Sequence, residues 1–218
     1  MSLTIGRAPF GRQRAGHFDF EVPATVTYVE PFPRRVRGMK GGATVVDSDR
    51  VLLVFRTGTI PHWAFLPEDV TIDARPDTAA PGYVRVEWDA ADEWWEEDER
   101  VFVHVRDPYT RVDCYPTSRH VRVTVGDMVV AESTRAVALY ETGLPTRYYL
   151  PRDDVRMELL EPSATVTQCP YKGTANHWST RDGVADVGWS YDDHVLRESE
   201  AIRGRLCFYD EKATIEIS

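Results

Sequence analysis

One sequence order appears twice in this 218-residue chain, and this internal repeat constrains the fold more than any other feature. The matching residues keep a separation of 85 positions, as Val36 and Val121 do. The other pairs are Arg37 and Arg122, Gly41 and Gly126, Ser48 and Ser133, Arg50 and Arg135, Thr57 and Thr142, Gly58 and Gly143, Asp69 and Asp154, and Val70 and Val155. The repeat predicts two similar units that pack as a pseudo-dimer, since half the chain alone buries little apolar surface.

A second set of matches fits the repeat after a shift of one residue. These matches are Pro61 with Pro145, Leu66 with Leu150, and Pro67 with Pro151. The Trp95 and Asp98 positions also resemble Trp189 and Asp192 further along the second copy.

Short β-branched runs predict that the chain is mainly β. Such runs occupy 26–29, 35–37, 43–46, 51–55, 205–209 and 213–217, and Gly41-Gly42 is a turn signal between two of them. Only residues 151–160 have a helical pattern, with a proline at the start and Pro162 after the end. We therefore expect a pseudo-symmetric β protein with one or two short helices.

The repeat also sets the expected domain limits. We expect an N-terminal arm over 1–23, a first β unit over 24–105, a connector over 106–114, and a second β unit over 115–218. The connector region is dense in polar residues, which fits either a hydrogen-bonded strut between the copies or a contribution to a site. Its polar residues are His104, Arg106, Asp107, Tyr109, Arg111 and Asp113.

The charge and the cysteines exclude several classes of protein. A net charge of −9 argues against a general nucleic-acid binder, which needs a basic face. The three cysteines, Cys114, Cys169 and Cys207, are odd in number and have no metal-type spacing. The chain also has no signal pattern and no apolar run of the ~20 residues that span a bilayer. We expect a cytoplasmic protein without nucleic-acid or membrane partners, and the oligomeric state stays open.

The stretch Cys169-Pro170-Tyr171-Lys172-Gly173 concentrates more chemistry than any other part of the chain, and only the second copy has it. Together with ETGLPTRYYLP (residues 141–151), it resembles the bacterial and fungal domain-of-unknown-function family 427, here as two tandem copies over 24–217. The resemblance implies two β-tent-like units and supplies no reaction. A nucleotidyltransferase label is sometimes attached to that family, but the sequence has no paired metal-binding carboxylates and no Gly-rich phosphate loop.

Cys169 and Glu141 are the candidate catalytic residues. A thiol close to Lys172 suits a nucleophile, provided that a base such as Glu141 or His177 lies within hydrogen-bond reach. The alternatives are a thiol that lines a pocket without reacting and a thiol that packs in the core.

The candidate binding residues combine two cations with aromatic side chains. Lys172 and Arg147 suit a carboxylate or phosphate, and aromatic residues suit an apolar or planar part of a ligand. The simpler alternatives are that Arg147 pairs with Glu141 across their own turn and that the aromatics pack in the core. The full set is Arg147, Tyr149, Tyr171, Lys172, Trp189 and Tyr191, with Tyr109 and Arg111 at the rim.

Two functions fit these residues. The first is a pocket for a small anionic molecule in the second unit, with or without a Cys- or Glu-dependent reaction. The second is a non-enzymatic structural or interaction module. Convergence of Cys169, Lys172 and Glu141 on one pocket favours the first.

We predict that the protein holds no structural zinc and needs no cofactor. A closed zinc site needs four closely placed Cys or His ligands, and the six histidines and three cysteines show no such spacing. Elemental analysis of the purified protein should find much less than one zinc per chain. One tightly held zinc per chain would contradict this expectation.

Overall fold

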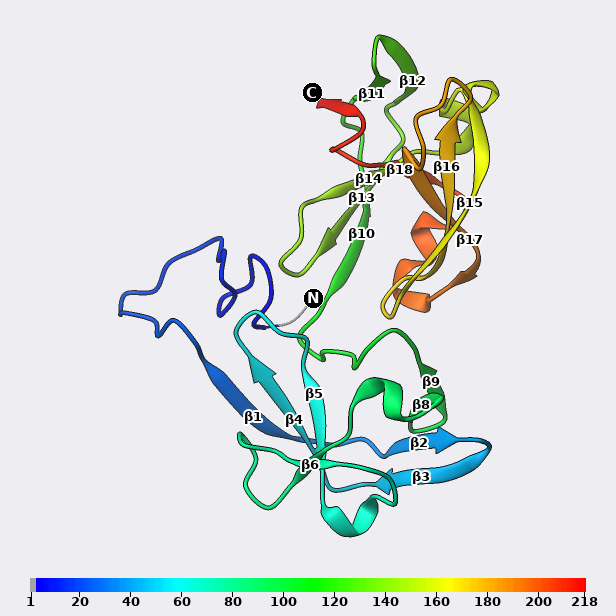
Figure 1. The fold of residues 1–218 in the computed structure, drawn as a ribbon. Coiled ribbons are helices and arrows are strands. Elements are labelled where there is room, and N and C mark those ends of the chain that lie inside the picture. The colour runs from blue at the N-terminus through cyan, green and yellow to red at the C-terminus, as the bar shows by residue number, and fades with distance from the viewer. Residues whose placement is uncertain (1–2) are drawn as a thin grey trace. The chain divides into compact units, whose positions relative to one another are not determined.

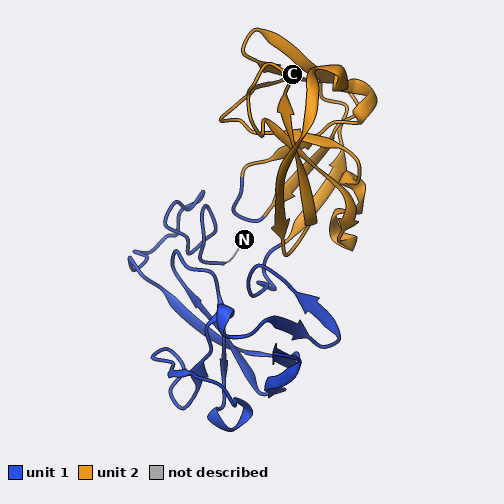
Figure 2. Cartoon of the chain, turned by 45° about the vertical axis from the view of Figure 1, so that its right-hand side comes forward, with its two compact units in different colours: residues 1–110, 142–144 blue, residues 111–141, 145–218 orange. Residues whose placement is uncertain are grey.

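The computed structural model describes residues 3–218, which form two compact units (Figure 2). Unit 1 consists of residues 1–110 and 142–144, and unit 2 consists of residues 111–141 and 145–218. The division after Thr110 falls within the predicted connector 106–114. Residues 1–2 of the predicted arm lie outside the described residues.

Unit 1 is built from two antiparallel sheets (Figure 1). The first sheet has the order β1-β4-β5-β7-β6, with bounds Thr27–Phe32, Val51–Arg56, His62–Phe65, Val84–Arg85 and Arg75–Pro76. The second sheet has the order β3-β2-β8-β9, with bounds Ala43–Ser48, Val36–Lys40, Glu93–Glu96 and Glu99–Val101.

Unit 2 is built from three antiparallel sheets. One has the order β10-β13-β14 (Val112–Pro116, Val137–Glu141 and Arg147–Tyr149), and another has the order β12-β11-β19 (Met128–Ser133, Val121–Val125 and Thr214–Ile217). The third has the order β15-β16-β17-β18 (Leu160–Cys169, Gly173–Thr180, Gly188–Val195 and Leu206–Phe208). A single bridge between Leu150 and Leu206 links β14 to the edge strand β18.

The prediction of a mainly β chain is confirmed, and most predicted strands lie within one or two residues of their expected limits. The turn between β2 and β3 shows why. Gly41 and Gly42 have φ angles of 56° and 79°, and a two-residue hairpin turn of this kind needs positive φ at both positions. The glycine pair therefore marked the hairpin in the sequence.

The predicted helix over 151–160 is replaced by two 3₁₀ turns, η3 (Arg152–Asp154) and η4 (Met157–Leu159). Strand-like pairing interrupts the helix between them. Val155 forms a bridge with Ala131, and the Arg156 backbone N–H donates to Val130 O at 2.8 Å. The other short helical segments are η1 (Pro67–Asp69), η2 (Trp88–Ala90) and η5 (Arg197–Ile202). Among residues 3–218, no helical segment has the length and apolar content needed to cross a membrane.

The same strand pairing occurs in both units at a separation of 85 positions. Thr27 pairs with Arg56 in unit 1, and Val112 pairs with Glu141 in unit 2. The next strand keeps this separation, since Val54 faces His62 and Leu139 faces Arg147. The one-residue shift inferred from Pro61 and Leu66-Pro67 is therefore wrong for these strands, because the two connecting loops, 57–61 and 142–146, have equal length.

A Ser–Asp–Arg contact recurs with the same separation. In unit 1, Ser48 Oγ donates to Asp69 at 2.7 Å, and Arg50 pairs with Asp69 at 2.8 Å. In unit 2, Ser133 Oγ donates to Asp154 at 2.6 Å, and Arg135 pairs with Asp154. Each contact fastens the end of a hairpin to a 3₁₀ turn, so the repeated residues carry a repeated structural task.

The units differ after the 3₁₀ turns η1 and η3. Residues 70–83 lead to β7 in unit 1, whereas residues 155–205 lead to β18 in unit 2 and contain the long β15–β16 hairpin and β17 (Figure 1). The expected correspondence of Trp95 with Trp189 is wrong. Trp95 pairs with Arg37 of β2, and its counterpart opposite Arg122 of β11 is Glu216 of β19. The similar aromatic and acidic residues of β17 suggested the wrong counterpart for Trp95.

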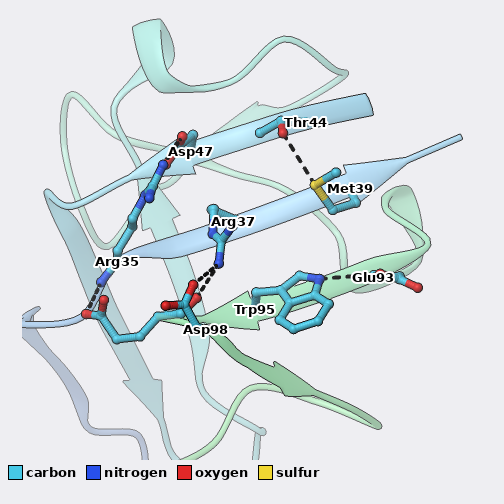
Figure 3. Close-up of polar contacts among 9 residues, drawn as sticks. Arg35, Arg37, Met39, Thr44, Asp47, Glu93, Trp95 and Asp98 are labelled. Carbon is cyan, nitrogen blue, oxygen red and sulfur yellow. Dashed lines mark hydrogen bonds and ion pairs between the residues drawn. The ribbon is translucent and has the colours of Figure 1, made fainter. Parts of the chain in front are cut away.

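Aromatic packing forms the core of unit 1. The Trp94 ring lies 5.4 Å from that of Trp63 and stacks on Phe65 at 6.1 Å. Gly38 faces Trp94 across β2 and β8, and a Cβ there would approach the Trp94 ring to 2.9 Å. The opposite face of these strands is polar: Arg37 pairs with Asp98, and Arg35 pairs with Asp47 (Figure 3).

The arm over residues 3–23 has defined contacts within unit 1. Thr57 Oγ1 donates to Phe10 O at 3.0 Å, and the Gly58 N–H donates to Thr4 O at 2.7 Å. The Phe10 ring stacks on that of Phe18, which contacts the Phe20 ring in a tilted arrangement. The arm thus covers the repeated Thr-Gly turn of this unit.

We predict that Ser133→Ala lowers the free energy of unfolding by about 1–3 kcal/mol, because the buried hydroxyl serves two partners. It donates to Asp154, and it accepts a hydrogen bond from the Arg135 N–H at 2.9 Å. Urea denaturation measures the change, and Ser48→Ala should give a similar loss. Thr134→Ala, at the exposed neighbouring position, is the control and should stay within about 0.5 kcal/mol of the parent. Equal effects of all three substitutions would contradict the role assigned to the serines.

Candidate functional site

The CPYKG stretch is the turn of the long hairpin in unit 2. Cys169 ends β15, Gly173 begins β16, and the two residues face each other across the turn. Gly173 has a φ of 111°, and a Cβ on it would lie 2.0 Å from His194 O. Only glycine fits this position, so the chain can turn tightly there and aim Lys172 inward.

Lys172 and Glu141 form a buried ion pair. Lys172 Nζ donates to Glu141 Oε2, and the side chains are only 11% and 5% exposed. Glu141 is the last residue of β13, and Lys172 lies in the turn of the β15–β16 hairpin. The pair therefore joins two sheets of unit 2, and removal of either charge leaves the other buried without its partner.

The Cys169 thiol is a second neighbour of the Lys172 ammonium. Burial lowers the pKa of Lys172, but the adjacent Cys169 and Glu141 outweigh burial, so the pKa lies above its usual value. Cys114 of β10 also lies within the field of Lys172, and burial raises the pKa of that thiol. The ammonium is thus the electrostatic centre of a group that contains one carboxylate and two half-buried thiols.

Three of the predicted aromatic residues gather beside this pair in a single hydrophobic cluster. Trp189 Nε1 donates to Tyr149 OH at 3.1 Å, and the Tyr149 ring lies 6.4 Å from that of Tyr191. Burial is the main cause that raises the pKa of Tyr149 and of Tyr191. Both phenols are therefore neutral at physiological pH. The three side chains are buried against one another and form a closed wall, not an open pocket.

Arg147 contacts the Trp189 ring of this cluster. Its guanidinium lies 5.6 Å from the centre of the Trp189 ring and pairs with Asp210 at 2.9 Å. The interpretation in which Arg147 pairs with Glu141 across their own turn is wrong, because Lys172 is the ion-pair partner of Glu141. The two predicted cations therefore have different anionic partners.

His177 does not act as a base for Cys169 in this arrangement. Its Nε2 lies 3.0 Å from Thr167 Oγ1, and its ring stacks on Tyr209. Gly173 faces Cys169, and His177 lies four residues further along β16, or about 13 Å at the usual strand rise. The partner found beside Cys169 is Lys172, which donates hydrogen bonds and does not remove protons.

The remaining predicted residues have contacts elsewhere. Tyr109 belongs to unit 1, where its hydroxyl donates to Glu30 at 2.8 Å and its ring contacts Phe55. Arg111 pairs with Asp113 at 2.7 Å and is 75% exposed. Tyr171 is half-buried in the hairpin turn, where its carbonyl oxygen accepts a hydrogen bond from Ser199. Within residues 3–218, no group of three His, Cys, Asp or Glu side chains is placed to hold a metal ion.

The sequence analysis missed three residues of this region: Cys114, Cys207 and Tyr209. Cys207 is fully buried, and burial raises the pKa of its thiol to about 12. Tyr209 packs on Trp189 with ring centres 4.3 Å apart. The strand run at 205–209 was predicted, so the alternation of faces there was a signal for Cys207, whereas Cys114 of β10 had been assigned to the connector 106–114. To place these residues in this region, the pairing of β10 with β13 and of β18 with β17 must also be known, and the sequence does not show it.

The second half of the chain is similar to a known protein family. The model of a family described as "Domain of unknown function (DUF427)" matches residues 113–218. The resemblance inferred from the CPYKG and ETGLPTRYYLP strings is thus confirmed for the second half of the chain, which contains the whole cluster around Lys172. No curated protein matches the chain.

We predict that Lys172→Met alone destabilises the protein by about 3–5 kcal/mol, because Glu141 then stays buried without an ammonium. Glu141→Leu alone should cost a similar amount for the converse reason. The double variant should recover most of the loss, since an apolar pair of similar volume is often neutral in such a place. Denaturant unfolding of the four proteins measures the coupling. Additive losses, or single losses below about 1 kcal/mol as in surface pairs, would contradict the buried pair.

Proposed function

We propose that the protein binds a small anionic molecule and that Lys172 of unit 2 recognises it. The observation that carries this proposal is an ammonium group held inside unit 2, 11% exposed, beside the half-buried Cys169. A lysine in such a place stays charged, because Cys169 and Glu141 compensate for its burial. An anion that enters beside Cys169 would share or replace the contact with Glu141.

Stability alone is a weak reason to keep this ion pair. An apolar pair of similar volume often stabilises a protein as well or better, because two charges no longer lose their hydration. Charged groups that are buried next to a thiol are more typical of functional sites than of cores. The pair also lies within residues 113–218, the part of the chain that matches the family model.

Binding without a reaction fits the residues better than catalysis. A thiol nucleophile needs a base, and His177 is engaged with Thr167 and Tyr209. Glu141, the other candidate base, is paired with Lys172. We therefore assign Cys169 to the lining of the site, and Tyr149, Trp189 and Tyr191 to the wall behind it.

The proposal also covers the organisation of the whole chain and its cellular setting. We propose that the chain is a tandem of two related units, because strand pairing and the Ser–Asp–Arg contact recur 85 positions apart. We further propose a cytoplasmic protein whose partner is a small molecule, not nucleic acid or membrane. Its net charge of −9 disfavours attraction to phosphate backbones and acidic lipid surfaces.

Alkylation of Cys169 provides a local test of this function. We predict that at least one anion of a panel of inorganic phosphate, sulfate, acetate and succinate slows the reaction of Cys169 with iodoacetamide. Peptide mass spectrometry follows the reaction at each cysteine, and the fully buried Cys207 is the internal reference. Protection should disappear in the Glu141→Leu, Lys172→Met double variant, which lacks the ammonium and which we expect to keep the fold.

Lys40→Met is the matched control, because Lys40 is an exposed lysine of unit 1. It should leave the protection unchanged. Full protection in the double variant, or no protection by any anion in the parent protein, would show that Lys172 does not bind anions.

A further inference from the structure

A large cavity opens in unit 1, away from the residues that the sequence singled out. Its volume is about 1160 Å³, at or above the usual range for small-molecule sites of roughly 300–1,000 Å³. It is lined by side chains of β1, β4, β5, β6 and β7 and by the turn that contains Gly58. The cavity is therefore large enough for a metabolite-sized molecule.

Basic side chains outnumber acidic ones in the lining. Arg56, Arg75 and Arg85 all border the cavity, together with His62. The chain has a net charge of −9, but the three arginines around this cavity form a locally positive region. Arginine offers a planar fork of N–H donors that matches carboxylate and phosphate oxygens.

The acidic groups near the cavity are already occupied. Asp77 is 4% exposed as a side chain, with Oδ2 at 2.5 Å from His62 Nε2 and Oδ1 accepting from the Ala79 N–H at 2.8 Å. Glu87 pairs with Arg75 at 2.6 Å and with Arg85 at 3.1 Å. These carboxylates hold Arg75, Arg85 and His62 in place. Arg56, which they do not contact, therefore gives the opening of the cavity its positive charge.

Arg56 differs in this respect from the arginines on the other sheet of unit 1. Arg35 and Arg37 are each bound by a carboxylate, Asp47 and Asp98 respectively (Figure 3). The Arg56 guanidinium has no ion pair or hydrogen bond with residues 3–218. Within the same part of the chain, Arg85 Nε is buried and without a hydrogen-bond acceptor. Arg56 therefore has donors available for an anion, and Arg85 adds a positive charge beside it while it stays paired with Glu87.

The lining also contains apolar surface. Val29, Val54, Ile60 and Ala79 border the same hollow, and the Thr27, Thr59 and Thr78 side chains add hydroxyl-bearing positions. A ligand that suits this lining has an anionic end for the arginines and an uncharged body for the aliphatic side chains.

We propose that this cavity of unit 1 is a second binding site, which takes a small organic oxyanion, a carboxylate or a phosphate ester, through Arg56, with the charge of Arg85 beside it. The site is independent of the function assigned to Lys172, because all of its lining residues belong to unit 1. Arg56 and His62 occupy the pairing positions that Glu141 and Arg147 occupy in unit 2. The two units therefore present opposite charges at corresponding strand ends.

Amide NMR titration of the full chain with inorganic phosphate and, separately, with succinate tests this site. At constant ionic strength, we expect saturable shifts of the Gly58 and Ala79 amide signals, and the tighter of the two probes identifies the phosphate or the carboxylate class. Arg56→Gln should weaken binding by about tenfold, because a charged hydrogen-bond donor is lost. Arg56→Glu should weaken it further. Arg56 is exposed and unpaired, so both variants should fold.

Arg35→Gln removes an arginine from the other sheet of unit 1 and should bind both probes as the parent does. The Glu141→Leu, Lys172→Met double variant should also keep the Gly58 and Ala79 shifts, which separates this site from the one in unit 2. Absence of saturable shifts in the parent would overturn the proposal. So would equal weakening by Arg35→Gln and Arg56→Gln, because general charge attraction would then explain the binding.

Discussion

The buried ion pair between Lys172 and Glu141 is the interaction on which the polar centre of unit 2 depends. It fastens the turn of the long β15–β16 hairpin to the end of β13. Gly173 makes this possible, because any side chain there would collide with His194 O and push the turn away. The fixed ammonium is surrounded by the thiol of Cys169 and by the aromatic cluster of Tyr149, Trp189 and Tyr191.

The pairing of β1, β4 and β5 in unit 1 has the register of β10, β13 and β14 in unit 2, but the strand ends carry different side chains. Corresponding strand ends hold Arg56 in unit 1 and Glu141 in unit 2. In unit 2, an inserted hairpin brings Lys172 onto the carboxylate and the site is nearly closed. In unit 1, residues 70–83 lie between β5 and β7, and a cavity beside the unpaired Arg56 remains.

Local signals in the sequence predicted much of the fold. The Gly41-Gly42 turn, the strand runs and the repeated Ser, Asp and Arg residues all act over short distances or recur in one order, so they are visible without a structure. The pairing of β8 and β19 with their central strands is a long-range choice, and matching letters at Trp95 and Trp189 gave the wrong partner. For the same reason the sequence located the residues around Lys172 but missed Cys114, and it gave no sign of the cavity beside Arg56, whose walls come from five separate strands.

The ionisation of Lys172 tests the central claim most directly, because a buried lysine without a partner and a buried lysine in an ion pair shift in opposite directions. A pH titration of the Lys172 ammonium, followed by NMR of the side chain, should give a pKa above the usual value of about 10.4. The ion pair then stabilises the fold fully below that usual value, and its contribution is lost as the pH rises through the raised pKa. In Glu141→Gln the pKa should fall, since burial then opposes the charge with less compensation. A pKa below the usual value in the parent protein would contradict the account, because it would mean that Lys172 is buried without its carboxylate.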